Sequence, residues 1–154
     1  MWGLEVTLPE SWHHLILVLH LMVTSVMVGV IWFVQHVHYP LKPYVDKSCF
    51  RDYQEQHIAR TGHIVALPML AEAALATMLI LAPAIHGKPG LAWLGALLLL
   101  GIWMATAVFQ VPQHKALTDG FSPQAHRRLT TSNWLRTGMW SARALIAAAL
   151  LAGG

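Results

Sequence analysis

Histidine is the chemically capable residue that this sequence contains in excess. Ten of its 154 residues are histidines, against seven acidic residues and a single cysteine. A neutral imidazole is the commonest metal ligand, and it also transfers protons near pH 7. Imidazole ligands suit iron, copper and zinc. The sequence therefore predicts a histidine-rich site that holds one of these metals or moves protons, with the candidate ligands His38, His57, His63 and His114.

Helical periodicity selects His38 over its neighbour His36. Two residues apart on an α-helix are separated by about 200°, so only one of these rings faces the interior. His38 shares the face of Gln35 and is predicted to be the inward ring. The remaining histidines near helix ends are expected at the membrane surface, in contact with headgroups and water. They are His13, His14, His86 and His126.

Amide and guanidinium groups complete the candidate catalytic set. Polar side chains recur at helical spacing along each apolar stretch of the chain. Gln110 and Asn133 are expected to orient substrate oxygens, and Arg136 to stabilise developing negative charge. In the third apolar stretch the inward line is predicted to contain Trp103, Thr106, Gln110 and His114.

Glu72 and Arg143 are charged residues deep inside apolar stretches. Both lie roughly 15 Å from the ends of their helices, near the middle of a bilayer. An isolated charge there is costly, so each needs a partner. The sequence predicts an ion pair between them, or contact of both with one polar ligand in the catalytic site. A pair that only fixes the register of the helices remains an equal alternative.

The elements that position these residues are apolar and long. The chain is 56% hydrophobic and 11% charged, whereas soluble domains carry about 25% charged residues. A helix needs about 20 apolar residues to cross a bilayer, and four stretches meet this requirement: residues 12–39, 63–85, 91–111 and 132–152. The sequence predicts one all-α domain over residues 1–154, an integral membrane four-helix bundle with a polar interior.

Prolines and a capping pair predict the ends of these helices. Pro40 and Pro112 are expected to end the first and third helices, because proline removes a backbone donor. Ser122 and Pro123 form an N-cap and first-turn pair, which predicts a last helix of about 29 residues that begins outside the membrane. Much of residues 42–60 is expected to form an interfacial helix.

The distribution of charge predicts the orientation. Loops 40–62 and 112–131 carry most of the lysine and arginine, whereas Glu5 and Glu10 make the N-terminal segment acidic. By the positive-inside rule both loops are cytoplasmic and both termini lie outside, as in a bacterial inner membrane. The N-terminus lacks the features of a cleaved signal peptide, so the first stretch is expected to remain a span. The single cysteine, Cys49, excludes an internal disulfide.

A short pattern joins the end of the third stretch to the fourth. Val111-Pro112-Gln113-His114 is followed, after a polar loop, by Asn133-Trp134-Leu135-Arg136-Thr137. This last third of the chain resembles the anthrone-oxygenase-like small four-helix membrane proteins, which have a polar-Pro-polar motif and an Asn-x-x-Arg-Thr motif there. The first half is richer in histidine than that family. The resemblance implies oxidation of an aromatic or polyketide-like substrate, with Asn133, Arg136 and His114 near the site.

A second resemblance concerns His20. Leu19-His20-Leu21, early in the first stretch, is similar to the axial-ligand position of small four-helix membrane proteins of haem metabolism, the protoporphyrinogen oxidase type. It implies a haem on His20 as an alternative cofactor.

These observations favour a membrane oxidoreductase that takes a lipophilic substrate from the bilayer into a cytoplasmic-side site. A transporter or channel is the alternative, because polar stripes can line a permeation path; four short spans would then require a homo-oligomer. A third interpretation is a structural or assembly protein with incidental histidines. Lysine and arginine form no basic stripe, so nucleic acid is not expected as a partner.

Overall fold

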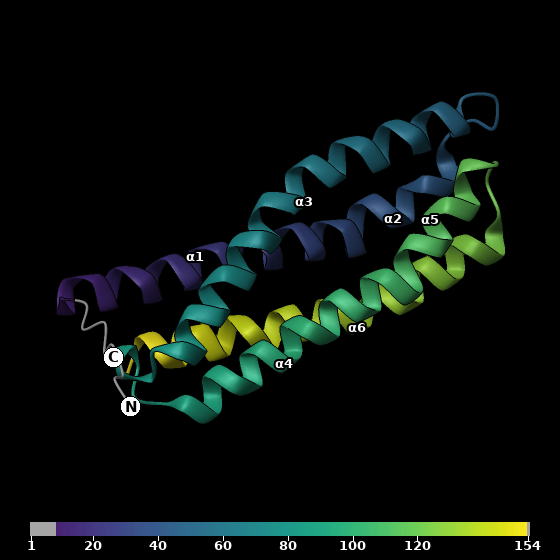
Figure 1. Cartoon of the computed structure of the whole chain (residues 1–154). Coiled ribbons are helices and arrows are strands. Elements are labelled where there is room, and N and C mark those ends of the chain that lie inside the picture. Colours follow the sequence, from purple (N-terminus) through teal and green to yellow (C-terminus); the bar gives the residue numbers. More distant parts are fainter. Residues whose placement is uncertain (1–8, 154) are drawn as a thin grey trace, which may run out of the picture.

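In the computed structural model, which describes residues 9–153, four long helical segments lie side by side (Figure 1). The described residues include no strand. The first segment joins α1 (Glu10–Phe33), the π-helical turn η1 (Val34–His38), α2 (Tyr39–Leu41) and the 3₁₀ turn η2 (Lys42–Tyr44). The second is α3 (Phe50–Leu81), followed by the 3₁₀ turn η3 (Pro83–Ile85). The third joins α4 (Pro89–Ala105), the π-helical turn η4 (Thr106–Gln110) and α5 (Val111–Thr118), and the fourth is α6 (Pro123–Leu151).

Three of these segments are long and apolar enough to cross a membrane: Ser11–Tyr44, Phe50–Leu81 and Pro89–Thr118. The fourth segment, α6, has 29 residues and begins as predicted, because Ser122 Oγ accepts the backbone N–H of Ala125 and Pro123 occupies the first turn. α6 packs against both α1 and α4, and α3 closes the bundle by packing against the same two helices. The predicted all-helical fold is thus confirmed.

The predicted helix ends at Pro40 and Pro112 are wrong. Both prolines lie inside continuous helical segments, and each is the second residue after a π-helical turn. A proline in a regular α-helix clashes with the carbonyl four residues earlier, which here belongs to His36 or Val108. Both carbonyls lie in the π turns, where the backbone is wider, so the helix continues past the proline ring.

The second helix also differs from its predicted bounds of residues 63–85. α3 begins at Phe50, so most of the expected interfacial helix is its first part, and it ends at Leu81. The charged side chains of this first part remain on the exposed face, where Arg51 and Glu55 form an ion pair of 3.2 Å. α3 therefore begins 13 residues before the predicted stretch, at Phe50 instead of residue 63, and these added turns include the inward residues Gln54 and His57.

The predicted ion pair in the middle of the bundle is confirmed. Arg143 Nη2 on α6 lies 3.2 Å from Glu72 Oε1 on α3, and both side chains are fully buried. Trp140 donates its indole N–H to the other carboxylate oxygen at 3.0 Å, and Arg143 donates to the backbone oxygen of Gly95 on α4. One buried cluster therefore joins three of the four segments.

We expect Arg143→Met to lower the free energy of unfolding by about 3–5 kcal/mol, because it leaves the Glu72 carboxylate buried without its counter-ion. Chemical or thermal denaturation in detergent measures the loss. The double variant Glu72→Leu with Arg143→Met serves as the control, since replacing a buried pair by apolar side chains is often close to neutral. A single variant as stable as the parent would show that the pair does not hold the bundle.

Candidate active site

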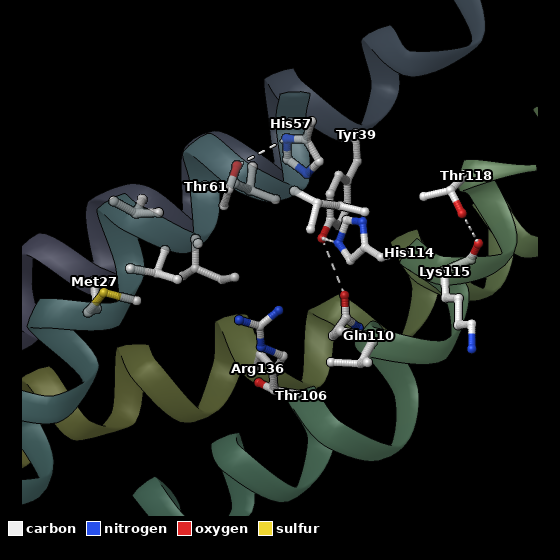
Figure 2. A pocket seen from close by; sticks show the side chains of 17 residues that line it. Met27, Tyr39, His57, Thr61, Thr106, Gln110, His114, Lys115, Thr118 and Arg136 are labelled. Carbon is white, nitrogen blue, oxygen red and sulfur yellow. Dashed lines mark hydrogen bonds between the residues drawn. The ribbon is translucent and has the colours of Figure 1, made fainter. Parts of the chain in front are cut away.

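A cavity of about 350 Å³ lies at the end of the bundle that holds both π turns. Residues from all four segments line it, and Figure 2 shows its polar side chains. The lining residues that are exposed lie on two helices only, Ile58 and Gly62 on α3, and Val111 and Lys115 on α5. The cavity therefore opens sideways between α3 and α5.

The His114 ring forms part of the cavity wall and is held from the loop side. Lys42, fully buried, donates to Gln54 Oε1 at 2.6 Å, and Gln54 Nε2 lies 3.1 Å from His114 Nδ1. An amide nitrogen can only donate, so His114 Nδ1 is an acceptor. A neutral His114 ring therefore carries its proton on Nε2.

The same chain of hydrogen bonds continues across the cavity wall to α6. His114 Nε2–H donates to Tyr39 Oη at 3.1 Å, and the Tyr39 hydroxyl donates to Gln110 Oε1 at 3.3 Å. Gln110 Nε2 then donates to Ser132 Oγ at 2.8 Å. Each of these polar groups has a partner, as buried polar groups generally do, so the chain fixes the rings of His114 and Tyr39 at the cavity.

Arg136 enters the cavity from α6, and its guanidinium group points inward in Figure 2. Only 8% of the residue is exposed. Its Nη1 donates to Asn133 Oδ1 at 3.1 Å, Asn133 Nδ2 donates to Gln35 Oε1 at 2.8 Å, and the guanidinium lies 5.1 Å from the centre of the Trp140 ring. Among the residues that the structure describes, Arg136 Nε has no hydrogen-bond partner. Within residues 9–153 no carboxylate lies within ion-pair distance of Arg136.

His57 faces the cavity from α3, across from Arg136 (Figure 2). Its Nδ1 lies 3.0 Å from Thr61 Oγ1, and across the part of the chain that the structure describes its Nε2 makes no hydrogen bond. The His57 ring packs on His38 with 4.2 Å between centroids. In the tautomer whose Nδ1–H donates to Thr61 Oγ1, the second nitrogen of His57, Nε2, is free to take a proton in the cavity.

The geometry of the four candidate histidines does not support the predicted metal site. The structure brings His38, His57 and His114 together, but His63 is exposed on α3 and does not line the cavity. No three His, Cys, Asp or Glu side chains within residues 9–153 are arranged to hold a metal ion. The lone pairs of imidazole lie in the ring plane, so the nearly parallel rings of His38 and His57, 23° apart, do not converge on one ion.

The haem suggested for His20 does not fit its surroundings either. His20 is buried, and neither of its ring nitrogens is hydrogen-bonded to another residue in the described part of the chain. It adjoins a space of only about 10 Å³ that Arg143, Gly95 and neighbouring side chains also line. This space is too small for a porphyrin and is close to the smallest space that holds one water molecule. Arg143 lines this small space and Glu72 is its ion-pair partner; neither residue lines the cavity of about 350 Å³.

Three further expectations are corrected. His86 was expected at the membrane surface but is buried. Its ring donates to the backbone oxygen of Leu79 and accepts the backbone N–H of Lys88. His126 is half-buried and donates to the backbone oxygen of Tyr39, and Trp103 is exposed rather than inward.

The inward placement of His38 is confirmed, since His36 is exposed and stacks on Trp32. Sequence reasoning missed Tyr39, Lys42 and Gln54. The only signal for Tyr39 was its position beside His38 and Pro40.

Fold and cavity together define an all-helical protein with three segments able to cross a membrane and a lateral, largely apolar site. No family model matches the sequence, and no curated protein or solved structure matches the chain.

We expect Tyr39→Phe to destabilise the protein by about 1–3 kcal/mol, the cost of leaving buried donors and acceptors unpaired, because His114 Nε2–H and Gln110 Oε1 both lose their partner. Denaturation in detergent measures the change. Tyr44→Phe is the matched control, since Tyr44 is 85% exposed. Equal stability of both variants would mean that the chain of hydrogen bonds is not formed.

Proposed function

We propose that the protein is integral to a membrane and crosses it four times, with the cavity at the cytoplasmic end. The outer face of α6 supports a fourth span although its average composition is polar. Beyond residue 133 its exposed residues are all apolar or glycine: Trp134, Leu135, Gly138, Leu145 and Ala148. Arg136 and Arg143 are buried in the bundle. Such an arrangement keeps charge away from lipid, and the excess of lysine and arginine near the cavity supports the orientation.

The proposed activity is oxidation of a lipophilic substrate that reaches the cavity from the bilayer. The observation that carries this proposal is the cavity itself, a largely apolar space that opens sideways and places the His57 ring opposite a guanidinium that has no carboxylate partner within residues 9–153. Small-molecule sites combine apolar walls with a few convergent polar groups in this way. The resemblance of residues 111–114 and 133–137 to anthrone oxygenases implies the same class of reaction.

The proposed chemistry begins with proton transfer. His57 Nε2 takes a proton from an acidic CH₂ group that is conjugated with a ketone through an aromatic ring, acting as general base. The electron pair left on carbon is shared with the ketone oxygen, and Arg136 stabilises the resulting oxyanion. Gln110 and Asn133 act indirectly, because Gln110 positions Tyr39 and Asn133 positions the Arg136 guanidinium.

Dioxygen is the proposed electron acceptor, since it dissolves in the bilayer and needs no binding site of its own. One oxygen atom joins the substrate carbon and the other leaves as water. The CH₂ group and one O₂ thus become a C=O group and one H₂O, which balances atoms and electrons. No metal is needed for this step, because the electron-rich enolate itself is the reductant.

We expect His57→Ala to slow oxygen consumption with an anthrone, a three-ring aromatic ketone, by about a hundredfold or more, the usual contribution of a positioned base. An oxygen electrode on purified protein in lipid nanodiscs gives the rate, and product absorption confirms it.

The matched control is His36→Ala, because His36 lies at the same level of the first segment but on its exposed face. It is expected to retain the parental rate. A parent protein with no oxygen consumption above background, or a His57→Ala variant as fast as the parent, would overturn the proposed reaction.

The native cysteine tests the orientation. Cys49 is exposed between η2 and α3, at the cavity end of the bundle. A membrane-impermeant maleimide is expected to label it in inside-out vesicles and not in right-side-out vesicles. For comparison, Cys49→Ser combined with Ala84→Cys moves the thiol to the exposed η3 turn at the other end, and the labelling should reverse. The opposite pattern would place the cavity on the outer side.

A further inference from the structure

Within residues 9–153, the inner wall of the cavity holds a positive charge that no acidic side chain neutralises. The neighbours of Arg136 there are the amide of Asn133, the ring of Trp140 and the hydroxyl of Tyr39, none of them a carboxylate. Its Nε is unpaired in the same residues although Arg136 is over nine-tenths buried. None of the 17 residues that line the cavity is acidic. A buried charge without a counter-ion is unfavourable. An anion that binds beside Arg136 would therefore be stabilised by an ion pair that the protein itself does not supply.

The other residues of the cavity wall determine the size and polarity of the rest of the ligand. Between α1 and α3 the lining is aliphatic, with Met27, Ile31 and Val65. The volume of about 350 Å³ is near the lower limit of small-molecule sites, which span roughly 300–1,000 Å³. A few fused rings fit such a space, whereas a phospholipid with two acyl chains does not.

The mouth between α3 and α5 restricts the form in which the ligand arrives. Ile58, Gly62, Val111 and Lys115 are exposed there, so a ligand from lipid passes two apolar side chains and one lysine before it reaches Arg136. On the lipid side such a ligand is favoured as a neutral molecule, because charge is costly in an apolar environment. His57 lies across from Arg136 and has a free ring nitrogen to receive a proton.

We propose that the ligand of the cavity is a lipophilic organic acid, a ring hydroxyl or enol on an apolar body, that enters neutral and binds as its anion. The O–H bond breaks, the proton goes to His57 Nε2, and the electron pair remains on the oxygen that Arg136 holds. For a substrate that binds as its enol, this anion is the same enolate that loss of the C–H proton would give, so His57 takes up one proton in all. This inference rests on the proposed function for the site, but it concerns the head group of the substrate rather than its oxidation.

An alkylated hydroxynaphthoquinone tests this inference, because it is a lipophilic acidic enol whose anion has its own visible absorption band. Its methyl ether has the same body without the acidic proton. In nanodiscs, binding to the parent protein is expected to be about ten- to a hundredfold tighter for the enol than for the ether, the effect of one hydrogen bond to a charged group. The bound enol should show the spectrum of its anion.

Arg136→Gln is expected to abolish this preference while ether binding persists, which also shows that the variant is folded. Arg128→Gln is the matched control, because Arg128 is exposed on the same helix, and it should keep the preference. Equal binding of enol and ether by the parent, or a neutral spectrum of the bound enol, overturns the inference. Oxygen consumption is scored separately, so an inactive protein that still selects the anion contradicts only the proposed oxidation.

Discussion

The ion pair between Glu72 and Arg143 is the constraint on which the rest of the bundle depends. A charge in the middle of an apolar bundle is tolerated only with its partner in contact, so α3 and α6 have one register that satisfies both groups. The bond from Arg143 to the Gly95 carbonyl adds α4 to this register. Arg136 lies two helical turns from Arg143 on α6, towards the cavity. The register set by the ion pair therefore also places Arg136 across from His57. The inner pair therefore braces the site without touching it.

The second constraint is the pairing of a π-helical turn with a proline in two different segments. Pro40 and Pro112 both follow such turns, and each turn contains a buried glutamine, Gln35 or Gln110. The extra residue in a π turn shifts the face that the following residues present. In the first segment this shift places Tyr39 at the cavity, and in the third it places His114 beside it. The irregular backbone is thus part of how the polar wall is assembled.

Periodicity and charge were enough to predict the helical fold, the start of α6, the central ion pair and the inward face of His38. These features follow from local rules or from the cost of an isolated charge. The π turns were not predictable, because regular spacing assumes a uniform helix and proline normally ends one. Lys42, Gln54 and Tyr39 escaped notice since their importance comes from contacts between segments, and His86 was placed wrongly because a turn specific to residues 79–88 buries its ring.

The sideways opening between α3 and α5 has a consequence for how the protein meets its ligand. For the proposed membrane-embedded protein, a ligand that comes through this opening is dissolved in lipid, so its effective concentration is its mole fraction in the bilayer and not its amount per volume of water. Diluting the membrane with inert lipid would then lower occupancy of the site, whereas diluting the vesicles in buffer would leave it unchanged. In this proposal the membrane is the solvent of the reaction, and saturation follows the composition of the lipid.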